Sequence, residues 1–308
     1  MALKVGIPKS LLYFHYYPGW KKFFTELGVE TVESSSSNRT IVDKGIKSAI
    51  DEACFPVKMC HGHVLDLCNR VDYLFLPRIV SVENNEYVCP KLMGLPDMIR
   101  SNIDNLPQLL TPTINRNQSW LSLLKANLEL GAKFTENKLK ILKAHWKANQ
   151  AFKKHHKDLT KSIKSQDRLV IALLGHSYLL NDQYINLGII DKLKNLGVEV
   201  ITPQNLASQQ IKQGANKLSK DLFWTFNKRI IGAAYYLFDR QEIDGIIQLA
   251  AFGCGPDALI GELIERKAKR RDDIHFMSLN LDEHSGEAGL LTRLEAFVDM
   301  IKWEVKGA

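Results

Sequence analysis

The sequence predicts an α/β protein with two Rossmann-like parallel-sheet domains in tandem, joined by a helical connector. Strand-like apolar segments alternate with helical patterns in both halves, which is typical of parallel sheets with right-handed crossovers. The 308 residues are too many for one ordinary doubly wound sheet and suit two domains. A lysine-rich helical stretch separates the halves. We therefore predict an N-terminal domain over 1–114, a connector over 115–166 and a C-terminal domain over 167–308.

The first elements of the N-terminal domain are a strand, a helix and a second strand. The apolar segment 4–8 predicts the first strand. Pro18 is expected to start the helix, because proline suits the first helical turn, and Gly28 is expected to end it as a C-cap. The segment 29–32 then predicts a short strand.

The rest of this domain continues the alternation. Asn38 is expected to N-cap a helix that reaches Ile50, because asparagine accepts a hydrogen bond from the first helical turn. A further helix is predicted over 56–67. The continuous apolar run 73–76 indicates a strand buried on both faces, and 109–110 indicates another strand.

The connector has the pattern of one or two amphipathic helices. Apolar residues keep helical spacing near its start, at Trp120, Leu121, Leu124 and Leu128. Lysines then form a predicted basic outer face, namely Lys133, Lys138, Lys140, Lys143, Lys147, Lys153, Lys154, Lys157, Lys161 and Lys164. A solvated helix face explains this row, and docking of an acidic partner is the alternative. The net charge is +7, but no nucleic-acid motif accompanies it, so we expect no nucleic-acid partner.

The C-terminal half restarts the alternation, although no clear sequence repeat links the halves. Apolar runs predict four strands, at 169–174, 198–201, 245–250 and 274–279. Helical spacing predicts helices between and after them, over 185–193 before Gly197, and over 223–237, 256–267 and 289–301.

The sequence composition indicates where in the cell the protein is located and which chemical roles its cysteines can have. No stretch of eighteen uncharged apolar residues occurs, so no membrane span is predicted. The N-terminus lacks the charge and apolar pattern of a secretory signal, and we expect a cytoplasmic protein. Disulfides are disfavoured there, and an odd number of cysteines argues against a full disulfide framework. The five are Cys54, Cys60, Cys68, Cys89 and Cys254.

Three cysteines lie at predicted strand ends or helix starts, where open α/β sheets collect their ligands. Cys254 lies between two glycines after a buried strand, and Pro256 begins the next helix. The free N–H groups and dipole of a helix N-terminus favour an anionic thiolate or sulfide. Cys54 and Cys89 also stand one or two residues before a proline.

The spacing of the cysteines leaves several interpretations open. Cys60 and Cys68 are eight residues apart on one predicted helix and are interpreted as buried structural thiols. The other three fit a zinc site with His61 or His63 as the fourth ligand. They also fit an iron–sulfur cubane with one open iron. Three unrelated core thiols are the remaining interpretation.

Polar residues near predicted strand ends are candidates for substrate binding or proton delivery. They are His15, Lys9, Arg78, Glu83, His176, Asp257, Asp282, Glu283 and His284. Asp282, His284 and Glu287, in the loop after the last strand, are the best of them, and His176 can line the same cleft. Caps, loop anchors and interdomain hydrogen bonds are the structural alternative for each.

Five segments carry a resemblance to a known family. They are KVGIPKSLLYFHYYPGW (4–20), DEACFPVKMCHGHV (51–64), DYLFLPRIVSVENNEYVCPKLMGLPDMIR (72–100), QLAAFGCGPDALI (248–260) and LNLDEHSGEAGLLTRLEAFVDMI (279–301). Through them the chain resembles the acyl-CoA dehydratase activase-related proteins. These belong to the superfamily of 2-hydroxyacyl-CoA dehydratase cluster-binding subunits and double-cubane cluster proteins.

The resemblance implies ligation of an iron–sulfur cluster by Cys54, Cys89 and Cys254, in the cleft between the two domains. The cluster is expected to be [4Fe–4S], or an [8Fe–9S] double cubane shared by a homodimer. An ATP-hydrolysing activase is the implied electron donor, and the chain itself has no Walker P-loop. Docking of the activase, or of CoA phosphates, becomes the functional interpretation of the lysine-rich face.

The expected function is reduction of a small substrate at this cluster, with Asp282, His284 and His176 as candidate catalytic residues. A non-catalytic iron–sulfur electron carrier or cluster-delivery protein is the alternative. A third interpretation is nucleotide binding, because Gly253, Gly255 and Ala258 superficially match the dinucleotide fingerprint. That match is weak, since it lies late in the chain.

Overall fold

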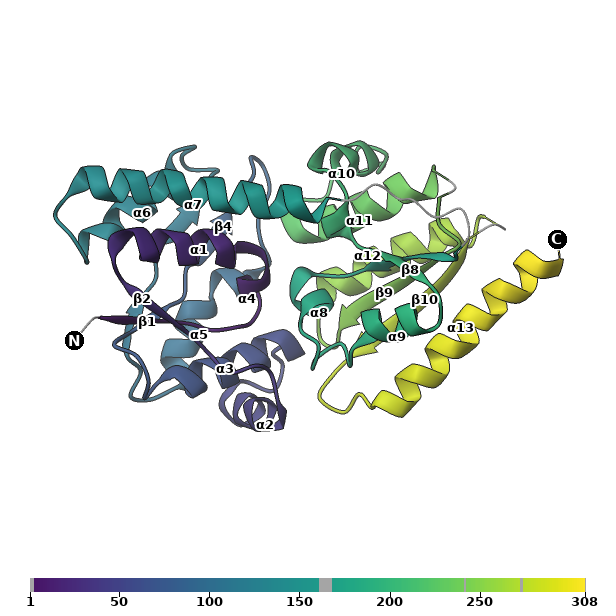
Figure 1. The fold of residues 1–308 in the computed structure, drawn as a ribbon, viewed down its shortest axis with the longest axis horizontal. Helices are drawn as coiled ribbons and strands as arrows, with labels where there is room; N and C mark the ends of the chain where they lie inside the picture. The colour runs from purple at the N-terminus through teal and green to yellow at the C-terminus, as the bar shows by residue number, and fades with distance from the viewer. Residues whose placement is uncertain (1–2, 161–167, 241, 272–273, 308) are drawn as a thin grey trace. The chain divides into compact units, whose positions relative to one another are not determined.

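The chain folds into two compact units. Unit 1 comprises residues 1–158 and 223–225, and unit 2 comprises 159–222 and 226–308. A computed structural model describes residues 3–160, 168–240, 242–271 and 274–307 (Figure 1). Lys161 and Lys164 of the predicted basic face lie outside these described residues.

Unit 1 is built on a parallel sheet of four strands in the order β2-β1-β3-β5. The strands are β1 (Lys4–Ile7), β2 (Glu30–Glu33), β3 (Tyr73–Phe75) and β5 (Gln108–Leu110). A second, two-stranded parallel sheet, which the sequence did not predict, pairs β4 (Arg78–Ser81) with β6 (Thr113–Asn115). The helices are α1 (Tyr13–Leu27), α2 (Arg39–Ser48), α3 (Phe55–Leu67), α4 (Pro90–Met93), α5 (Leu95–Asn102), α6 (Ser122–Ala132) and α7 (Lys138–Leu159).

Two of the predicted helix ends in unit 1 are confirmed and two are wrong. Gly28 ends α1 in the left-handed conformation, with φ of 78°, and Asn38 accepts a hydrogen bond from Ile41 N–H at 3.1 Å at the start of α2. Pro18 does not start α1, which begins at Tyr13. It lies inside the helix, which tolerates the loss of one backbone donor there. Ile50 lies beyond the end of α2 and is exposed.

Residues 115–158 of the predicted connector are part of unit 1. Ile141, Ala144 and Ala148 of α7 join the core cluster that contains Val5 and Phe24. This apolar face of α7 repeats at helical spacing, so its burial fixes the helix against α1.

Two lysines of α7 reinforce the same contact. Lys140 Nζ donates to Leu27 O at 2.9 Å, and Lys147 Nζ pairs with the Glu26 carboxylate at 3.1 Å. The predicted basic face is therefore not uniform, because these two lysines hold α7 to the end of α1.

Unit 2 is built on a parallel sheet in the order β10-β9-β7-β8. Its strands are β7 (Val170–Leu174), β8 (Glu199–Ile201), β9 (Gly245–Ala251) and β10 (His275–Leu281). Its helices are α8 (Ser177–Asn181), α9 (Ile189–Asn195), α10 (Ser208–Ala215), α11 (Thr225–Phe238), α12 (Gly255–Ala268) and α13 (Glu287–Gly307), with a 3₁₀ helix η1 (Pro203–Asn205). Every residue of β7 and β9 is buried, including the polar Gln248 of β9.

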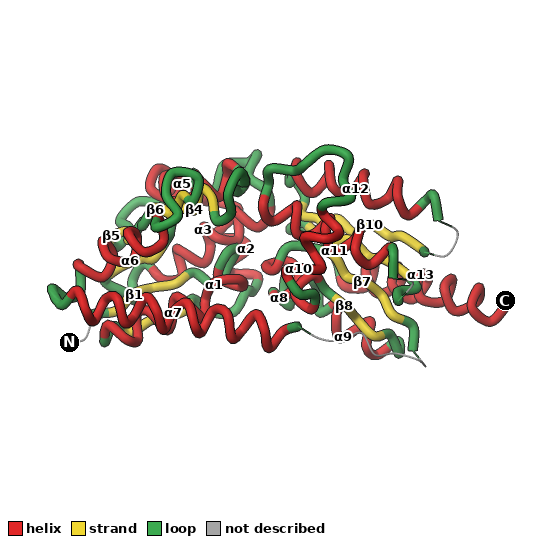
Figure 2. The backbone as a smooth tube through the Cα atoms, turned by 90° about the horizontal axis from the view of Figure 1, so that it is seen from above, coloured by secondary structure: helices red, strands yellow, loops and turns green. Residues whose placement is uncertain are grey.

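The two sheets have the same strand order. In each, the first strand in the chain lies between the second and the third, and the last pairs with the third. Figure 2 shows the strands of both sheets flanked by helices. The predicted α/β class with parallel sheets is confirmed.

A close crossing of two helices follows the second strand in both units. A Cβ added to Gly62 of α3 would lie 2.0 Å from Ile41 O of α2. A Cβ added to Gly214 of α10 would lie 1.9 Å from Gly232 O of α11. Only glycine allows the backbones to approach this closely.

Among the described helices, none is long and apolar enough to cross a membrane.

Candidate metal centre

Each of the three cysteines singled out in the sequence occupies the N-cap of a helix. Cys54 precedes α3, Cys89 precedes α4 and Cys254 precedes α12, and each helix has a proline in its first two positions. An N-cap stands at the positive end of the helix dipole, beside backbone N–H groups that have no intrahelical partner. This local position suits a thiolate ligand. The predicted helix starts at Cys54 and Cys254 are confirmed, whereas the short helix after Cys89 was not predicted.

In unit 1 the loops that carry Cys54 and Cys89 are tied to each other. Lys91 Nζ, in the first turn of α4, donates to Glu52 O at 2.7 Å, two residues before Cys54. The Cys54 side chain is buried, with 8% of the residue exposed, and Cys89 is half-buried. Two thiols from distant parts of the chain are therefore presented by adjoining loops.

In unit 2, Cys254 lies in a cluster with His176 and Asp257. One potential ligand atom from each residue lies within 4.8 Å of the other two. His176 Nε2 and Asp257 Oδ1 are 2.8 Å apart. A thiol, an imidazole and a carboxylate are all ligands that zinc-class ions accept.

The topology of unit 2 explains why these three residues meet. His176 follows β7 and caps α8, whereas Cys254 follows β9 and caps α12. Because β7 and β9 are parallel neighbours, their carboxyl ends lie at one edge of the sheet. Gly253, with φ of 77°, adopts the left-handed turn that leads from β9 to Cys254.

Asp257 carries the buried negative charge of this cluster. Only 1% of the residue is exposed, and Oδ1 also accepts a hydrogen bond from Asn227 Nδ2 at 2.9 Å. Burial alone would raise the pKa of this carboxyl. The neighbouring His176 and the hydrogen bonds from His176, Cys254 and the Ala251 N–H outweigh burial and hold the pKa below its usual value. The carboxylate is thus ionised in a water-poor site.

The other two cysteines have the environments of structural thiols. Cys60 is buried in α3, and burial raises the pKa of its thiol to about 11. Cys68 is the C-cap of α3, and its thiol donates to Val64 O at 3.3 Å. Cys60 agrees with the predicted buried thiol, whereas Cys68 is only half-buried.

The histidines considered for a zinc site have other partners in unit 1. His61 Nδ1 lies 2.9 Å from Val57 O. His63 Nδ1 lies 2.9 Å from Ser34 Oγ, and His63 Nε2 lies 3.0 Å from Ser37 Oγ. Burial lowers the pKa of His63 to about 4, so its ring is neutral. Both ring nitrogens of His63 are engaged with hydroxyls, which favours a structural role.

The loop after β10 is ordered by its own side chains. Asp282 Oδ1 accepts from His284 N–H at 2.9 Å and from Ser285 Oγ at 2.8 Å. Glu287 pairs with Lys192 at 2.7 Å, and His284 is exposed. Asp282 therefore anchors this loop, while the catalytic roles of Asp282 and His284 stay predictions.

Other candidates from the sequence also have structural partners. The His15 ring, in α1, packs on Phe152 and His156 of α7. Arg78 pairs with Asp97 at 2.6 Å and also donates to Met93 O at 3.0 Å. These contacts hold helices to their neighbours within unit 1.

The nucleotide interpretation is disfavoured by the start of α12. The glycine pattern does lie between β9 and α12, but Asp257 occupies the first turn of that helix as a buried carboxylate. A phosphate at this N-terminus would meet a like charge.

Comparison with known proteins gives one family and a number of distant structures, three of which are described. A family model described as "CoA enzyme activase uncharacterised domain" matches residues 4–206. No curated protein matches the chain. The chain is similar to the crystal structure of ZnuA, at 12% identity over 98% of each chain, with a TM-score of 0.29.

Two streptococcal structures are similar to the same extent. The laminin-binding protein Lbp of Streptococcus pyogenes has 12% identity over 98% of each chain, with a TM-score of 0.27. The laminin-binding protein Lmb of Streptococcus agalactiae has 11% identity over 98% of this chain and 100% of that one, with a TM-score of 0.28. Likenesses this weak carry no information on the function of this chain.

Proposed function

This chain belongs to the family of the CoA enzyme activase uncharacterised domain, and on that premise we propose that it is an iron–sulfur protein with Cys54, Cys89 and Cys254 as ligands. We propose further that it accepts low-potential electrons from an ATP-hydrolysing activase and reduces a small substrate. The observation that carries the assignment is that all three thiols are helix N-caps followed by proline, whereas Cys60 and Cys68 are not.

The N-cap position matters because the ligand set is strongly anionic. Three thiolates together with sulfide concentrate negative charge, and the helix N-termini at Cys54 and Cys89 provide partial positive charge and free N–H donors. At Cys254 the Asp257 carboxylate offsets this charge, and His176 beside it is the polar group that can donate. The tie between Lys91 and Glu52 holds two of the three helix starts together within unit 1. When bound by these cysteines, the cluster supplies one-electron transfer. The proposed assembly is one [4Fe–4S] cluster per chain or a double cubane in a homodimer.

His176 is the proposed proton donor beside this ligand set. Its Nε2 donates a hydrogen bond to Asp257 Oδ1 at 2.8 Å, and this N–H carries the proton that we propose is delivered. The position next to Cys254 places this proton near electrons delivered to the site. Reduction of an organic substrate consumes protons as well as electrons, which gives His176 a role in the proposed chemistry.

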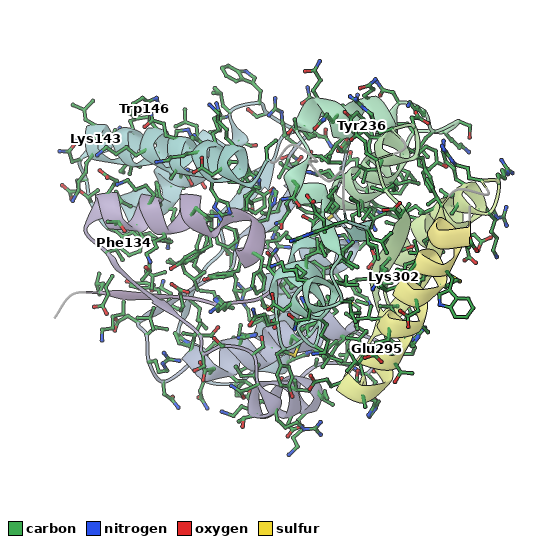
Figure 3. All side chains as sticks on the ribbon, turned by 45° about the vertical axis from the view of Figure 1, so that its right-hand side comes forward. Phe134, Lys143, Trp146, Tyr236, Glu295 and Lys302 are labelled. Carbon is green, nitrogen blue, oxygen red and sulfur yellow. The ribbon has the colours of Figure 1, made fainter. Side chains whose placement is uncertain are left out.

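The exposed face of α7 is the proposed docking surface for the activase. Its lysines include Lys138, Lys143, Lys153, Lys154 and Lys157. Trp146 is 59% exposed on the same helix, and Figure 3 shows Lys143 and Trp146 on its outer side. Basic side chains around an exposed aromatic ring fit an acidic protein partner. Charge reversal at Lys143, Lys153 and Lys154 should weaken activase binding more strongly at low than at high salt.

The ligand assignment is tested by iron and sulfide analysis of protein prepared without oxygen. Cys54→Ser, Cys89→Ser and Cys254→Ser should each lose cluster, and Cys68→Ser should retain it as the matched control. Full iron and sulfide content in all three ligand variants would refute the assignment.

The electron-transfer role is tested separately with the wild-type protein and an activase. ATP-dependent bleaching of the cluster absorbance, followed by turnover of a small electron acceptor, supports a reductive enzyme. Bleaching without turnover indicates an electron carrier. An activase that leaves the absorbance unchanged in the presence of ATP contradicts both roles.

A further inference from the structure

We infer that unit 2 also contains a mononuclear site for a divalent transition-metal ion of the zinc class, with Cys254, His176 and Asp257 as its ligands. The site requires no residue of unit 1, so it does not depend on the proposed cluster. Because Cys254 would serve both, a mononuclear ion and the cluster exclude each other on this residue.

The geometry needs only a small adjustment to accept an ion. The three ligand atoms lie within 4.8 Å of one another. Around tetrahedral zinc, sulfur, nitrogen and oxygen ligands lie about 3.5 Å from each other. Side-chain movements of roughly 1 Å are therefore sufficient. Three protein ligands leave a fourth position open to water or substrate, as in catalytic zinc sites.

The charges also match. The Cys254 thiolate and the Asp257 carboxylate together carry two negative charges, which a divalent cation neutralises, and His176 binds as the neutral ring. The thiol proton and any proton between His176 and Asp257 pass to solvent when the ion binds. Neutrality matters here because Asp257 and His176 are both at least nine-tenths buried.

Neighbouring residues orient the ligands before any ion binds. Asn227 Nδ2 donates to Asp257 Oδ1 at 2.9 Å, and Ala251 N–H donates to Oδ2 at 3.5 Å. The His176 ring stacks on Tyr178, with ring centroids 4.9 Å apart and planes 14° from parallel. Fixed outer contacts of this kind are what metal sites use to hold carboxylate and imidazole ligands.

The test is titration of cluster-free, fully reduced full-length protein with Co²⁺, followed by Zn²⁺. We expect one Co²⁺ per chain with the visible spectrum of a tetrahedral ion and a thiolate charge-transfer band, and displacement by Zn²⁺. Cys54→Ser/Cys89→Ser should bind Co²⁺ as the wild type does, although it cannot assemble the proposed cluster. Cys254→Ser should lose the thiolate band, and His176→Gln and Asp257→Asn should bind at least tenfold more weakly.

Asn227→Ala provides a variant that leaves all three ligands in place. It should weaken Co²⁺ binding about 10-fold to 100-fold, as loss of an outer-shell partner does. A thiolate band that persists in Cys254→Ser, or one that disappears in Cys54→Ser/Cys89→Ser, would overturn the inference, because the ion would then lie elsewhere. Failure of the cluster assignment leaves the double-variant result unchanged, so the two proposals are distinguishable.

Discussion

The two units share an architecture but bury their histidines in opposite surroundings. Both have the same strand order and a glycine-mediated helix crossing after the second strand. In unit 1, His63 is enclosed by the hydroxyls of Ser34 and Ser37, and burial keeps the ring neutral. In unit 2, His176 faces the buried carboxylate of Asp257 beside Cys254.

The difference shows that the fold alone does not determine the chemistry. A hydroxyl environment makes a buried histidine part of the framework, because desolvation opposes its charge. A carboxylate and a thiol beside the ring instead bring together side chains of the kinds that bind metal ions. The residues that follow β7 and β9 therefore give unit 2 a cluster of potential metal ligands at one sheet edge, whereas unit 1 offers two thiols on adjoining loops.

The largest effects are expected where the units are most alike, at the helix crossings. Gly62→Ala in unit 1 and Gly214→Ala in unit 2 would each force a methyl group against a backbone carbonyl. Each should destabilise its own unit by about 3 kcal/mol or more, because the backbones must separate. Hydrogen exchange resolved by peptide should show the loss in the unit that carries the change.

Gly289→Ala, in α13, is the matched control, because an added Cβ meets nothing within 4 Å. It should be neutral or stabilise by up to about 1 kcal/mol, as alanine is the better helix former. Equal stability of all three variants would show that the crossings are not closely packed.

The second test concerns the neutral histidine of unit 1. The pKa of His63 falls from 6.5 to about 4 in the folded protein, so between these values the unfolded chain binds more protons. Stability should therefore fall as the pH is lowered through this window, by about 3 kcal/mol in total. His63→Gln should remove this dependence, which urea unfolding at a series of pH values measures. An unchanged pH slope in His63→Gln would contradict the neutral assignment.

A smaller change in stability is expected at the helix N-caps. It distinguishes an N-cap residue that stabilises its helix from one that presents a ligand. Asn38→Ala removes the hydrogen bond to Ile41 N–H and should cost about 1 kcal/mol. The thiol of Cys54 does not form such a cap bond, so Cys54→Ser in cluster-free protein should change stability by less than about 0.5 kcal/mol. Thermal unfolding of both variants makes the comparison, and a larger loss in Cys54→Ser would assign that cysteine to the framework.

The smallest effect is expected on the surface of unit 1. Lys147→Met removes a half-exposed ion pair with Glu26 and should cost less than about 1 kcal/mol. Lys143→Met, on the exposed side of the same helix, should leave stability unchanged while it lowers affinity for an acidic partner. If the two variants lose stability equally, the division of the α7 lysines into two classes is wrong.

Local sequence signals predicted much of this fold. The buried strands β7 and β9, the N-cap at Asn38 and the C-cap at Gly28 depend on nearby residues, and the cysteine positions before helices follow from the prolines. The helix start predicted at Pro18 was wrong, because packing along the whole of α1 overrode the local preference of proline for the first helical turn.

Local sequence signals did not predict contacts between residues that are far apart in the chain. The sequence marked His176 and Asp257 separately as cleft candidates, but their pairing depends on the parallel register of β7 and β9. Asn227, which orients Asp257 from α11, carried no signal at all. The small sheet of β4 and β6 was missed because both strands are short and lack a continuous apolar run.

Native mass spectrometry of protein prepared without oxygen tests whether Cys254 helps to hold an iron–sulfur cluster. We expect an added mass of iron and sulfide on the wild type and on Cys68→Ser, and its absence from Cys254→Ser. The same spectrum distinguishes one cubane per chain from a double cubane on a dimer. Wild-type protein without iron and sulfide, or Cys254→Ser with the full added mass, would contradict the claim.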